Sequence, residues 1–291
     1  MKPAAFEYSR PADIDEACAL LAADDGARVI AGGQTMVPLM AMRLARPTRL
    51  IDIARIPGLA YVRDEGKEIA IGATTKQHAI ENDPVVRIKL PLLAKVMPFV
   101  GHTATRARGT VGGSLVNGDP AAEIVLVAAT LGATLIWREA GKDHPIAASD
   151  FFLGPMVTAL PLTACLAEAR FPVWPEPRVG VGFHEINARQ SDFAFVSAAA
   201  QVALDGDGRC TRAAIGIGAA TAVPLRLDRA AHALQGQRFY EPKVRDAIKA
   251  ELSGIEAMDD LHASAEYRKR VAVTLAVRAI ADAYQDAARR T

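Results

Sequence analysis

Cysteine is scarce in this sequence, with three residues among 291. Cys18, Cys165 and Cys210 are isolated from one another along the chain, and none belongs to a Cys-x-x-Cys pair. This spacing argues against an iron–sulfur cluster held by this chain alone, so each thiol is expected to be a small buried side chain. The six histidines are scattered, and none has a partner at metal-ligand spacing. No metal site is predicted.

An excess of charge and long apolar runs are also missing. The formal net charge is +1, which favours neither nucleic acid nor an anionic membrane as a partner. No apolar run approaches the roughly 18 residues of a membrane-spanning helix. Residues 1–7 lack the apolar stretch of a signal peptide. We therefore expect a cytoplasmic globular protein, long enough for two domains, with no membrane span and no nucleic-acid partner.

The two best-known nucleotide-binding motifs are absent as well. No Gly-x-x-x-x-Gly-Lys-Ser/Thr string occurs, which excludes a P-loop. The segment 216–221, Gly-Ile-Gly-Ala-Ala-Thr, begins like a dinucleotide fingerprint, but Pro224 follows too soon for the long helix that this motif requires. We interpret this segment as the end of a strand.

Two glycine-rich segments stand out against these absences. The first is Val29, Ile30, Ala31, Gly32, Gly33, Gln34, Thr35 and Met36. The second runs from Arg108 to Ser114 and continues to Glu123. Glycine lets backbone N–H groups approach an anion closely, and a following helix adds roughly half a positive charge. Either segment alone is typical of a tight turn, but two loops that each precede a helix predict a ligand with two phosphates, such as a dinucleotide.

The periodicity of the remaining chain predicts an α+β protein. A capping box at Asp13 and Glu16 begins an early helix, and the segment 205–208, Asp-Gly-Asp-Gly, predicts a hairpin. Strands are expected at 6–8, 28–31, 50–53, 60–63, 68–71, 133–138, 195–204 and 211–218, with further short strands before Phe171. Helices are expected at 13–26, 35–43, 75–81, 92–100, 121–131, 228–234, 242–252 and 265–287. Prolines at 172, 175 and 177 indicate a linker.

Several motifs resemble the FAD-binding medium subunit of the molybdenum hydroxylases, the family of the carbon monoxide, quinoline, nicotine and xanthine dehydrogenases. The motifs are 31–35 (AGGQT), 43–47 (RLARP), 50–53 (LIDI), 71–75 (IGATT), 106–115 (RARGTVGGSL) and 119–123 (DPAAE). Further matches lie at 151–154, at 158–160, and at Arg189 with 192–194. The resemblance covers nearly the whole chain in order.

This resemblance implies a two-subdomain FAD-binding domain of the vanillyl-alcohol oxidase/PCMH type over residues 1–175. Its subdomains are expected at about 1–56 and 57–175. A flavoprotein C-terminal α+β domain would follow over residues 178–288. The dinucleotide is expected in the cleft between the two subdomains.

The resemblance also implies a set of cofactor-binding residues and no catalytic residue. Residues 29–36 would form the first pyrophosphate loop, and Thr110, Gly112, Gly113 and Ser114 the second. The other expected contacts are Asn117, where relatives often have histidine; Asp119 and Glu123, which bind the cofactor or hold the loop; Leu166, against the flavin; and His184, where relatives often have lysine. His184 would change the electrostatic bias on the flavin, or it is simply a surface histidine. Phe193 would cover a ring face or belong to the core.

By the same resemblance, the chain carries FAD and relays electrons within a heterotrimer. A small subunit with two [2Fe–2S] clusters would supply the electrons, and a large subunit with the molybdenum cofactor would oxidise an N-heteroaromatic, CO or aldehyde-type substrate. A dimer of heterotrimers is implied, and the apolar faces of the C-terminal helices are either docking faces or domain core. The alternatives are a stand-alone FAD-dependent reductase or oxidase, and a non-catalytic module in which the glycine segments are only turns.

Overall fold

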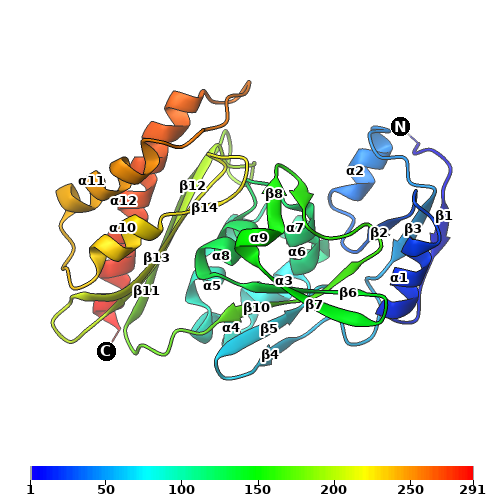
Figure 1. Cartoon of the computed structure of the whole chain (residues 1–291), viewed down its shortest axis with the longest axis horizontal. Coiled ribbons are helices and arrows are strands. Elements are labelled where there is room, and N and C mark those ends of the chain that lie inside the picture. Colours follow the sequence, from blue (N-terminus) through cyan, green and yellow to red (C-terminus); the bar gives the residue numbers. More distant parts are fainter. Residues whose placement is uncertain (1, 291) are drawn as a thin grey trace.

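The computed structural model describes residues 2–290, which form three bodies arranged in a row (Figure 1). A small N-terminal lobe lies at one end, and a five-stranded sheet with its helices lies in the middle. A four-stranded sheet covered by three helices lies at the other end. The middle body therefore contacts both of the others, and it is where the predicted site would be framed.

The N-terminal lobe is built on a three-stranded parallel sheet of order β1-β3-β2. Its elements are β1 (Glu7–Ser9), α1 (Ile14–Ala22), β2 (Arg28–Ile30), α2 (Met36–Ala41) and β3 (Arg49–Asp52). Asp13 caps α1, because its Oδ1 accepts the backbone N–H of Glu16 at 2.8 Å. The N-cap predicted at Asp13 is confirmed, and the Glu16 carboxylate accepts the N–H of Ala12 at 2.6 Å rather than that of Asp13. The strands and helices expected in this part of the chain are present. This lobe brings the end of β2, and with it the first glycine segment, up against the middle body.

The middle body contains an antiparallel sheet of order β4-β5-β10-β6-β7. These strands are β4 (Val62–Asp64), β5 (Glu68–Gly72), β10 (Cys165–Pro172), β6 (Thr134–Glu139) and β7 (Lys142–Ala147). The other elements are α3 (Gln77–Asn82), α4 (Pro84–Lys89), α5 (Pro91–Val96), η1 (Met97–Phe99), α6 (Thr103–Arg108), α7 (Val111–Asn117), α8 (Glu123–Leu131), α9 (Ala148–Phe151), β8 (Phe152–Gly154) and β9 (Val157–Thr158). The strands expected at 60–63 and 68–71 are confirmed and form the β4–β5 hairpin, whereas α4 and α6, each six residues long, are too short for periodicity to predict.

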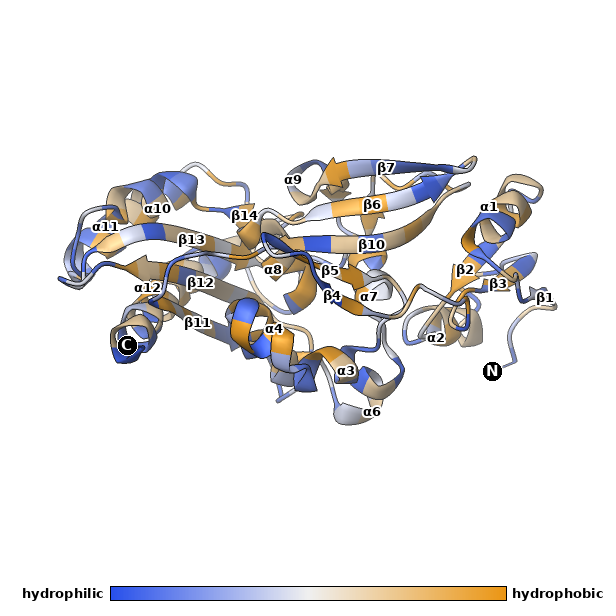
Figure 2. Cartoon of the chain, turned by 90° about the horizontal axis from the view of Figure 1, so that it is seen from below, coloured by the Kyte–Doolittle hydropathy of each residue, from blue (hydrophilic) through white to orange (hydrophobic). Residues whose placement is uncertain are grey.

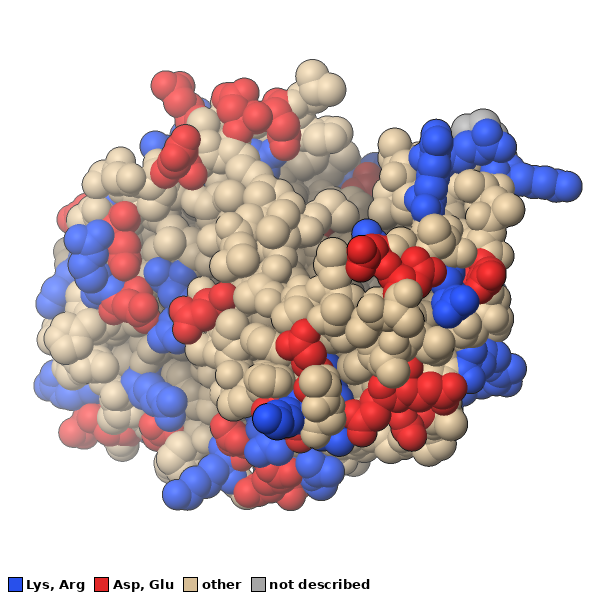
Figure 3. Space-filling view, turned by 45° about the vertical axis from the view of Figure 1, so that its right-hand side comes forward, with Lys and Arg blue, Asp and Glu red and all other residues tan. Residues whose placement is uncertain are grey.

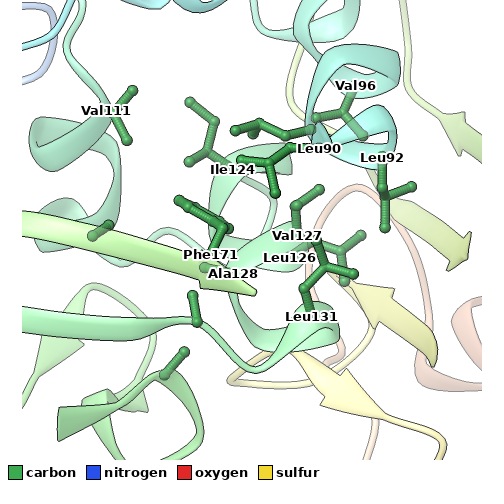
Figure 4. Close-up of a cluster of buried hydrophobic side chains, with 14 of the residues drawn as sticks. Leu90, Leu92, Val96, Val111, Ile124, Leu126, Val127, Ala128, Leu131 and Phe171 are labelled. Carbon is green, nitrogen blue, oxygen red and sulfur yellow. The ribbon is translucent and has the colours of Figure 1, made fainter. Parts of the chain in front are cut away.

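Helix α8 is the centre of the main core. All nine of its residues are buried, and Figure 4 shows Ile124, Val127 and Leu131 among the side chains of the surrounding cluster. Gly132 ends the helix in the left-handed conformation with φ of +70°. Glu123 is the first residue of this apolar helix, so the core fixes the position of its carboxyl group.

The C-terminal body is a four-stranded antiparallel sheet of order β11-β12-β13-β14 with helices on one face. Its elements are β11 (Val179–Ile186), β12 (Val196–Leu204), β13 (Cys210–Gly218), β14 (Leu225–Arg226), α10 (Asp228–Leu234), α11 (Glu241–Leu252) and α12 (Ala265–Arg289). The other face contributes Val179, Val181 and Phe183 to the main core. The sheet is therefore covered on both faces, and every residue of β12 is buried.

Strand β11 was not predicted because its alternating Val and Gly residues look like a loop. The glycines have a packing role instead. A Cβ at Gly180 or Gly182 would collide with the backbone of α12, at Ala283 and Ala279 respectively. The even-numbered residues of β11 therefore face α12, and the odd-numbered ones face the middle body.

Apolar side chains gather between the layers. Figure 2 shows hydrophobic colour on the inner strands and on buried helices such as α8. The inward faces of the three C-terminal helices belong to a second buried cluster, so of the two interpretations left open, domain core is the one that holds. Within residues 2–290, no helix has both the length and the apolar character needed to span a bilayer.

Two of the cysteines are neighbours in space, contrary to their isolation in the sequence. Cys18 on α1 and Cys165 on β10 are both buried, and hydrogen bonding between their thiols raises the pKa of Cys165 and lowers that of Cys18. Because the two cysteines lie in different elements far apart in the chain, their spacing in the sequence does not predict that they are in contact. They join the N-terminal lobe to the middle sheet, and Cys210 is buried in the C-terminal body.

Candidate functional site

The first glycine segment forms the connection between β2 and α2. Gly33 has φ of +70°, a conformation that strongly favours glycine. Over the described residues, the backbone N–H groups from Gly32 to Met36 have no hydrogen-bond acceptor within the protein. Thr35 does not cap α2 with its side chain. The segment therefore presents a run of free amide donors at a helix N-terminus, an arrangement that suits an anion.

The second glycine segment is not a loop before a helix, as predicted, but the first turn of α7. Thr110 is the N-cap, and its Oγ1 accepts the N–H of Gly113 at 3.0 Å. The N–H groups of Val111 and Gly112 donate to the carbonyls of Thr75 and Ala73 at 3.0 and 2.9 Å. These amides and that of Ser114, which donates to the Thr110 carbonyl at 3.1 Å, are already paired, whereas five consecutive amides of the first segment are free.

The two glycine segments touch each other. A Cβ at Gly32 would lie 2.5 Å from the carbonyl oxygen of Arg108 and 2.8 Å from Cα of Gly109. Lys76 Nζ donates to the same Arg108 carbonyl at 2.8 Å, and burial lowers the pKa of this lysine. Sequence reasoning missed Lys76 because a lone lysine carries no motif. It adds a cation at the junction of the two segments.

Helical periodicity explains which residues of the second segment are buried and which are exposed. Val111, Gly112 and Leu115 are buried, whereas Gly113 is exposed and Ser114 and Asn117 are partly exposed. No Cβ fits at Gly112, which lies against Ala73; the position would be 2.6 Å from the Ala73 Cβ and carbonyl oxygen. The side chains of Ser114 and Asn117 have no hydrogen-bond partner among residues 2–290. The exposed face of α7 is therefore the face that a ligand would meet.

The turn between α7 and α8 holds two acidic residues in different environments. Asp119 Oδ1 accepts the N–H of Ala121 at 2.9 Å and so stabilises the turn. Glu123 is only 8% exposed, and no other residue in the described part of the chain donates a hydrogen bond to its carboxyl group. Burial, together with the nearby Asp119 charge, raises the pKa of Glu123 to about 7, against the opposing effects of its own backbone N–H and of Arg106.

The remaining predicted residues lie apart from this group. Leu166 is 3% exposed in the main core, opposite Trp137 in the sheet, so a flavin contact there remains a prediction. Phe193 is 73% exposed and is not part of the core. The His184 side chain does not face the other candidate residues, because it pairs with Asp282 on the opposite side of the C-terminal sheet.

The imidazole of His184 is directed at α12 and away from the middle body. Its Nε2 lies 2.9 Å from Asp282 of α12, and His184 shares the face of β11 with Gly180 and Gly182. Asp282 lines a groove of about 530 Å³ together with Arg87 and Lys95, on α4 and α5. The expectation that His184 lies beside the flavin is thus not supported by the side-chain geometry.

Two family models match the chain. One, described as the FAD binding domain in molybdopterin dehydrogenase, matches residues 4–174. The chain belongs to this family. The other, the CO dehydrogenase flavoprotein C-terminal domain, matches residues 182–283. The family is that of the FAD-carrying medium subunits of molybdenum hydroxylases, and the fold class expected from the sequence is confirmed.

Individual relatives align over nearly their whole length. The nicotine 6-hydroxylase medium subunit of Paenarthrobacter nicotinovorans is 33% identical, over 97% of this chain and 99% of the relative. The carbon monoxide dehydrogenase medium chain of Afipia carboxidovorans is 31% identical, over 96% and 97%. Among solved structures, quinoline 2-oxidoreductase from Pseudomonas putida 86 is similar with a TM-score of 0.93, 34% identity and 99% of both chains covered.

The residues present fit FAD. The free amides of the first segment suit the pyrophosphate. The buried carboxyl of Glu123 and the side chains of Ser114 and Asn117 supply polar groups for the rest of the cofactor. The surface is hollowed where the N-terminal lobe meets the rest of the molecule (Figure 3). In residues 2–290 no group of three or more His, Cys, Asp or Glu side chains is arranged to hold a metal ion.

Proposed function

We propose that FAD binds between α2 and α7, with its pyrophosphate on the free amides of residues 32–36. What supports this proposal most directly is the contrast between the two segments: five consecutive amides without acceptors in the first, and paired amides from Val111 to Ser114 in the second. Gly32 then keeps the two segments in contact, and Lys76 contributes positive charge at their junction. We keep residues 29–36, Thr110, Gly112, Gly113, Ser114, Asn117, Asp119, Glu123 and Leu166 in the proposed site and leave out His184.

The proposed roles differ within this set. Thr110 and Gly112 hold α7 in place by capping and close packing, whereas Gly113, Ser114 and Asn117 form its ligand-facing surface. Glu123 presents a buried carboxyl beyond the C-terminus of α7, and Leu166 forms part of the apolar wall. The domain limits that we propose remain 1–175 and 178–288, with a subdomain division at about residue 56.

FAD, when bound, exchanges electrons one or two at a time, and the protein's own part is to bind, orient and shield it. We propose that the chain does this within a complex that includes a small [2Fe–2S] subunit and a large subunit with the molybdenum cofactor, arranged as a dimer of heterotrimers in the cytoplasm. The relatives at 33% identity include a nicotine 6-hydroxylase and a caffeine dehydrogenase, which favours an N-heteroaromatic substrate on the large subunit.

Exposed apolar side chains on the middle body support a partner surface there. Leu153, Met156 and Val157, on and between β8 and β9, are 63%, 50% and 53% exposed, and Leu162 is 70% exposed. Large apolar side chains in water favour association with another protein. The inward faces of the C-terminal helices, by contrast, are buried in their own domain.

Copurification with the neighbouring subunits tests this function. Tagged chain from its native host should bring down two further subunits, with iron and molybdenum present only in that complex. Addition of the organic substrate should then bleach the flavin absorption of the complex and leave the isolated chain unchanged. Rapid NADH oxidation by the isolated chain, without partners, would instead favour the stand-alone reductase.

A further inference from the structure

A second group of unpaired polar atoms faces Glu123 from the C-terminal sheet. Glu185 on β11 and Ser197 on β12 lie directly opposite each other in the sheet, and Ser197 in turn lies opposite Gly218 on β13. Residues opposite one another in an antiparallel sheet share a face. Since the odd-numbered residues of β11 face the middle body, Glu185 and Ser197 face it as well.

This row of residues lies under the turn that carries Glu123. The N–H of Ala219 donates to the carbonyl of Pro120 at 2.8 Å, which joins the end of β13 to that turn. A Cβ at Gly218 would be 2.5 Å from Ser197 Oγ and 3.4 Å from the Pro120 carbonyl oxygen. The sheet and the α7–α8 turn are thus in direct contact at this point.

Two oxygen atoms of this row are buried and have no partner. They are Glu185 Oε2 and Ser197 Oγ, and Ser197 is only 1% exposed. Glu185 Oε1, in contrast, accepts from Asn187 Nδ2 at 2.9 Å. A buried oxygen without a hydrogen bond costs about 1–3 kcal/mol, so two of them near the buried carboxyl of Glu123 favour a ligand that completes the site.

The position of this group along the cofactor follows from the length of α7. This helix is seven residues long, so it spans about 10 Å from its start beside the glycine segments to its end at Asn117. A cofactor that has its pyrophosphate at the first segment and runs along α7 would bring one of its two nucleotide halves to Glu123 and Glu185.

We propose that Glu185 is a flavin-site residue supplied by the C-terminal domain, and that it holds a proton at Oε2 and donates it as a hydrogen bond to the ribityl–isoalloxazine half of FAD. The proposal rests on FAD binding at the site described above. Ser197 lies beside this carboxyl as a second hydrogen-bond donor. Glu185 takes the place that the sequence had suggested for its neighbour, His184.

The electrostatics of the pocket keep the proton on Glu185. Burial and the Glu123 carboxylate raise the pKa of Glu185 to about 8, against the opposing hydrogen bond from Asn187. Asp119 and Arg106 act on Glu123 with opposite signs. Asn187 and Ser197 are neutral, so Glu123 is the charged group that acts on Glu185 directly. A neutral carboxyl can donate to the many acceptor atoms of the flavin, whereas a carboxylate cannot.

The test is the pH dependence of FAD affinity in the full-length chain, measured by quenching of FAD fluorescence between pH 6.5 and 9. If binding requires the protonated carboxyl, the dissociation constant of the wild-type chain rises about tenfold between pH 7 and 9. Glu185→Gln, which keeps a donor at all pH values, should remove this rise. His184→Gln is the matched control on the opposite face of the same strand and should keep it.

Three results would overturn the proposal: a flat wild-type profile, an unchanged rise in Glu185→Gln, or loss of the rise in His184→Gln. ADP-ribose, which carries the pyrophosphate without the flavin, should bind with no such rise; the same rise with ADP-ribose would place Glu185 away from the flavin half. A wild-type chain that binds no FAD at any pH would instead refute the proposed FAD site itself.

Discussion

Gly33 offers the sharpest test of the first segment, because its backbone has φ of +70° and its neighbours 34–36 present free amides. Valine in this conformation costs about 1–2 kcal/mol, so Gly33→Val should push the segment into another conformation and turn these amides away from the pyrophosphate. A hydrogen bond to a charged group is worth about 1.5–3 kcal/mol. The loss of one such bond should therefore raise the dissociation constant of FAD about 10- to 150-fold.

The matched control is Gly66→Val, in the turn of the β4–β5 hairpin. Gly66 has φ of +82° and nothing within 4 Å of an added Cβ, so this variant carries the same backbone penalty away from the site. Both variants should lose similar stability in urea denaturation, and only Gly33→Val should lose FAD affinity in a fluorescence titration. Equal FAD affinity in the two variants would refute the assignment of the first segment to the pyrophosphate.

Three further predictions concern packing, charge and capping. Gly112→Val should lower the free energy of unfolding by about 2–3 kcal/mol, because its Cβ would lie 2.6 Å from Ala73. Gly113→Ala should lower it less, and equal losses of the two variants in urea denaturation would contradict this packing. The pKa of Glu123 is raised from 4.5 to about 7 in the folded chain, so its contribution to the free energy of unfolding of the FAD-free chain is fully present below pH 4.5 and is lost as the pH rises through 7, on the order of 3 kcal/mol. Glu123→Gln should flatten this part of the pH profile measured by urea denaturation. An unchanged profile would contradict the burial argument. Ser264 is the N-cap of α12, and its Oγ accepts the Tyr267 N–H. Ser264→Ala should lower the free energy of unfolding by about 1 kcal/mol in thermal unfolding, and an unchanged Tm would show that the cap contributes nothing.

Much of the fold follows from local sequence signals. The capping box at Asp13, the alternation in the β4–β5 hairpin and the glycine after α8 each correspond to an element that the structure contains. These signals are local in the chain, and a periodic apolar pattern or a turn residue is enough to produce them. The missed elements include β11, α4, α6 and α7. They are either too short for a periodic pattern or contain glycines whose role depends on a segment far away in the chain.

The site was predictable only in part, for a similar reason. The sequence identifies the glycine segments, but it does not reveal that the N–H groups of Val111 and Gly112 are paired with carbonyls of residues 75 and 73. Nor does it reveal which of His184 and Glu185 faces the middle body, because that depends on which face of β11 packs against α12. Such assignments require the register of the sheet and the packing of helices on it, which come from contacts between segments far apart in the chain.

The central claim is that this chain carries FAD within a molybdenum hydroxylase, and the absorption spectrum of the natively purified complex tests it most directly. Cofactor released by acid and identified by chromatography should be FAD, in about a one-to-one ratio with this chain, with iron and molybdenum in the same complex. An intact complex that contains this chain and no flavin would contradict the claim.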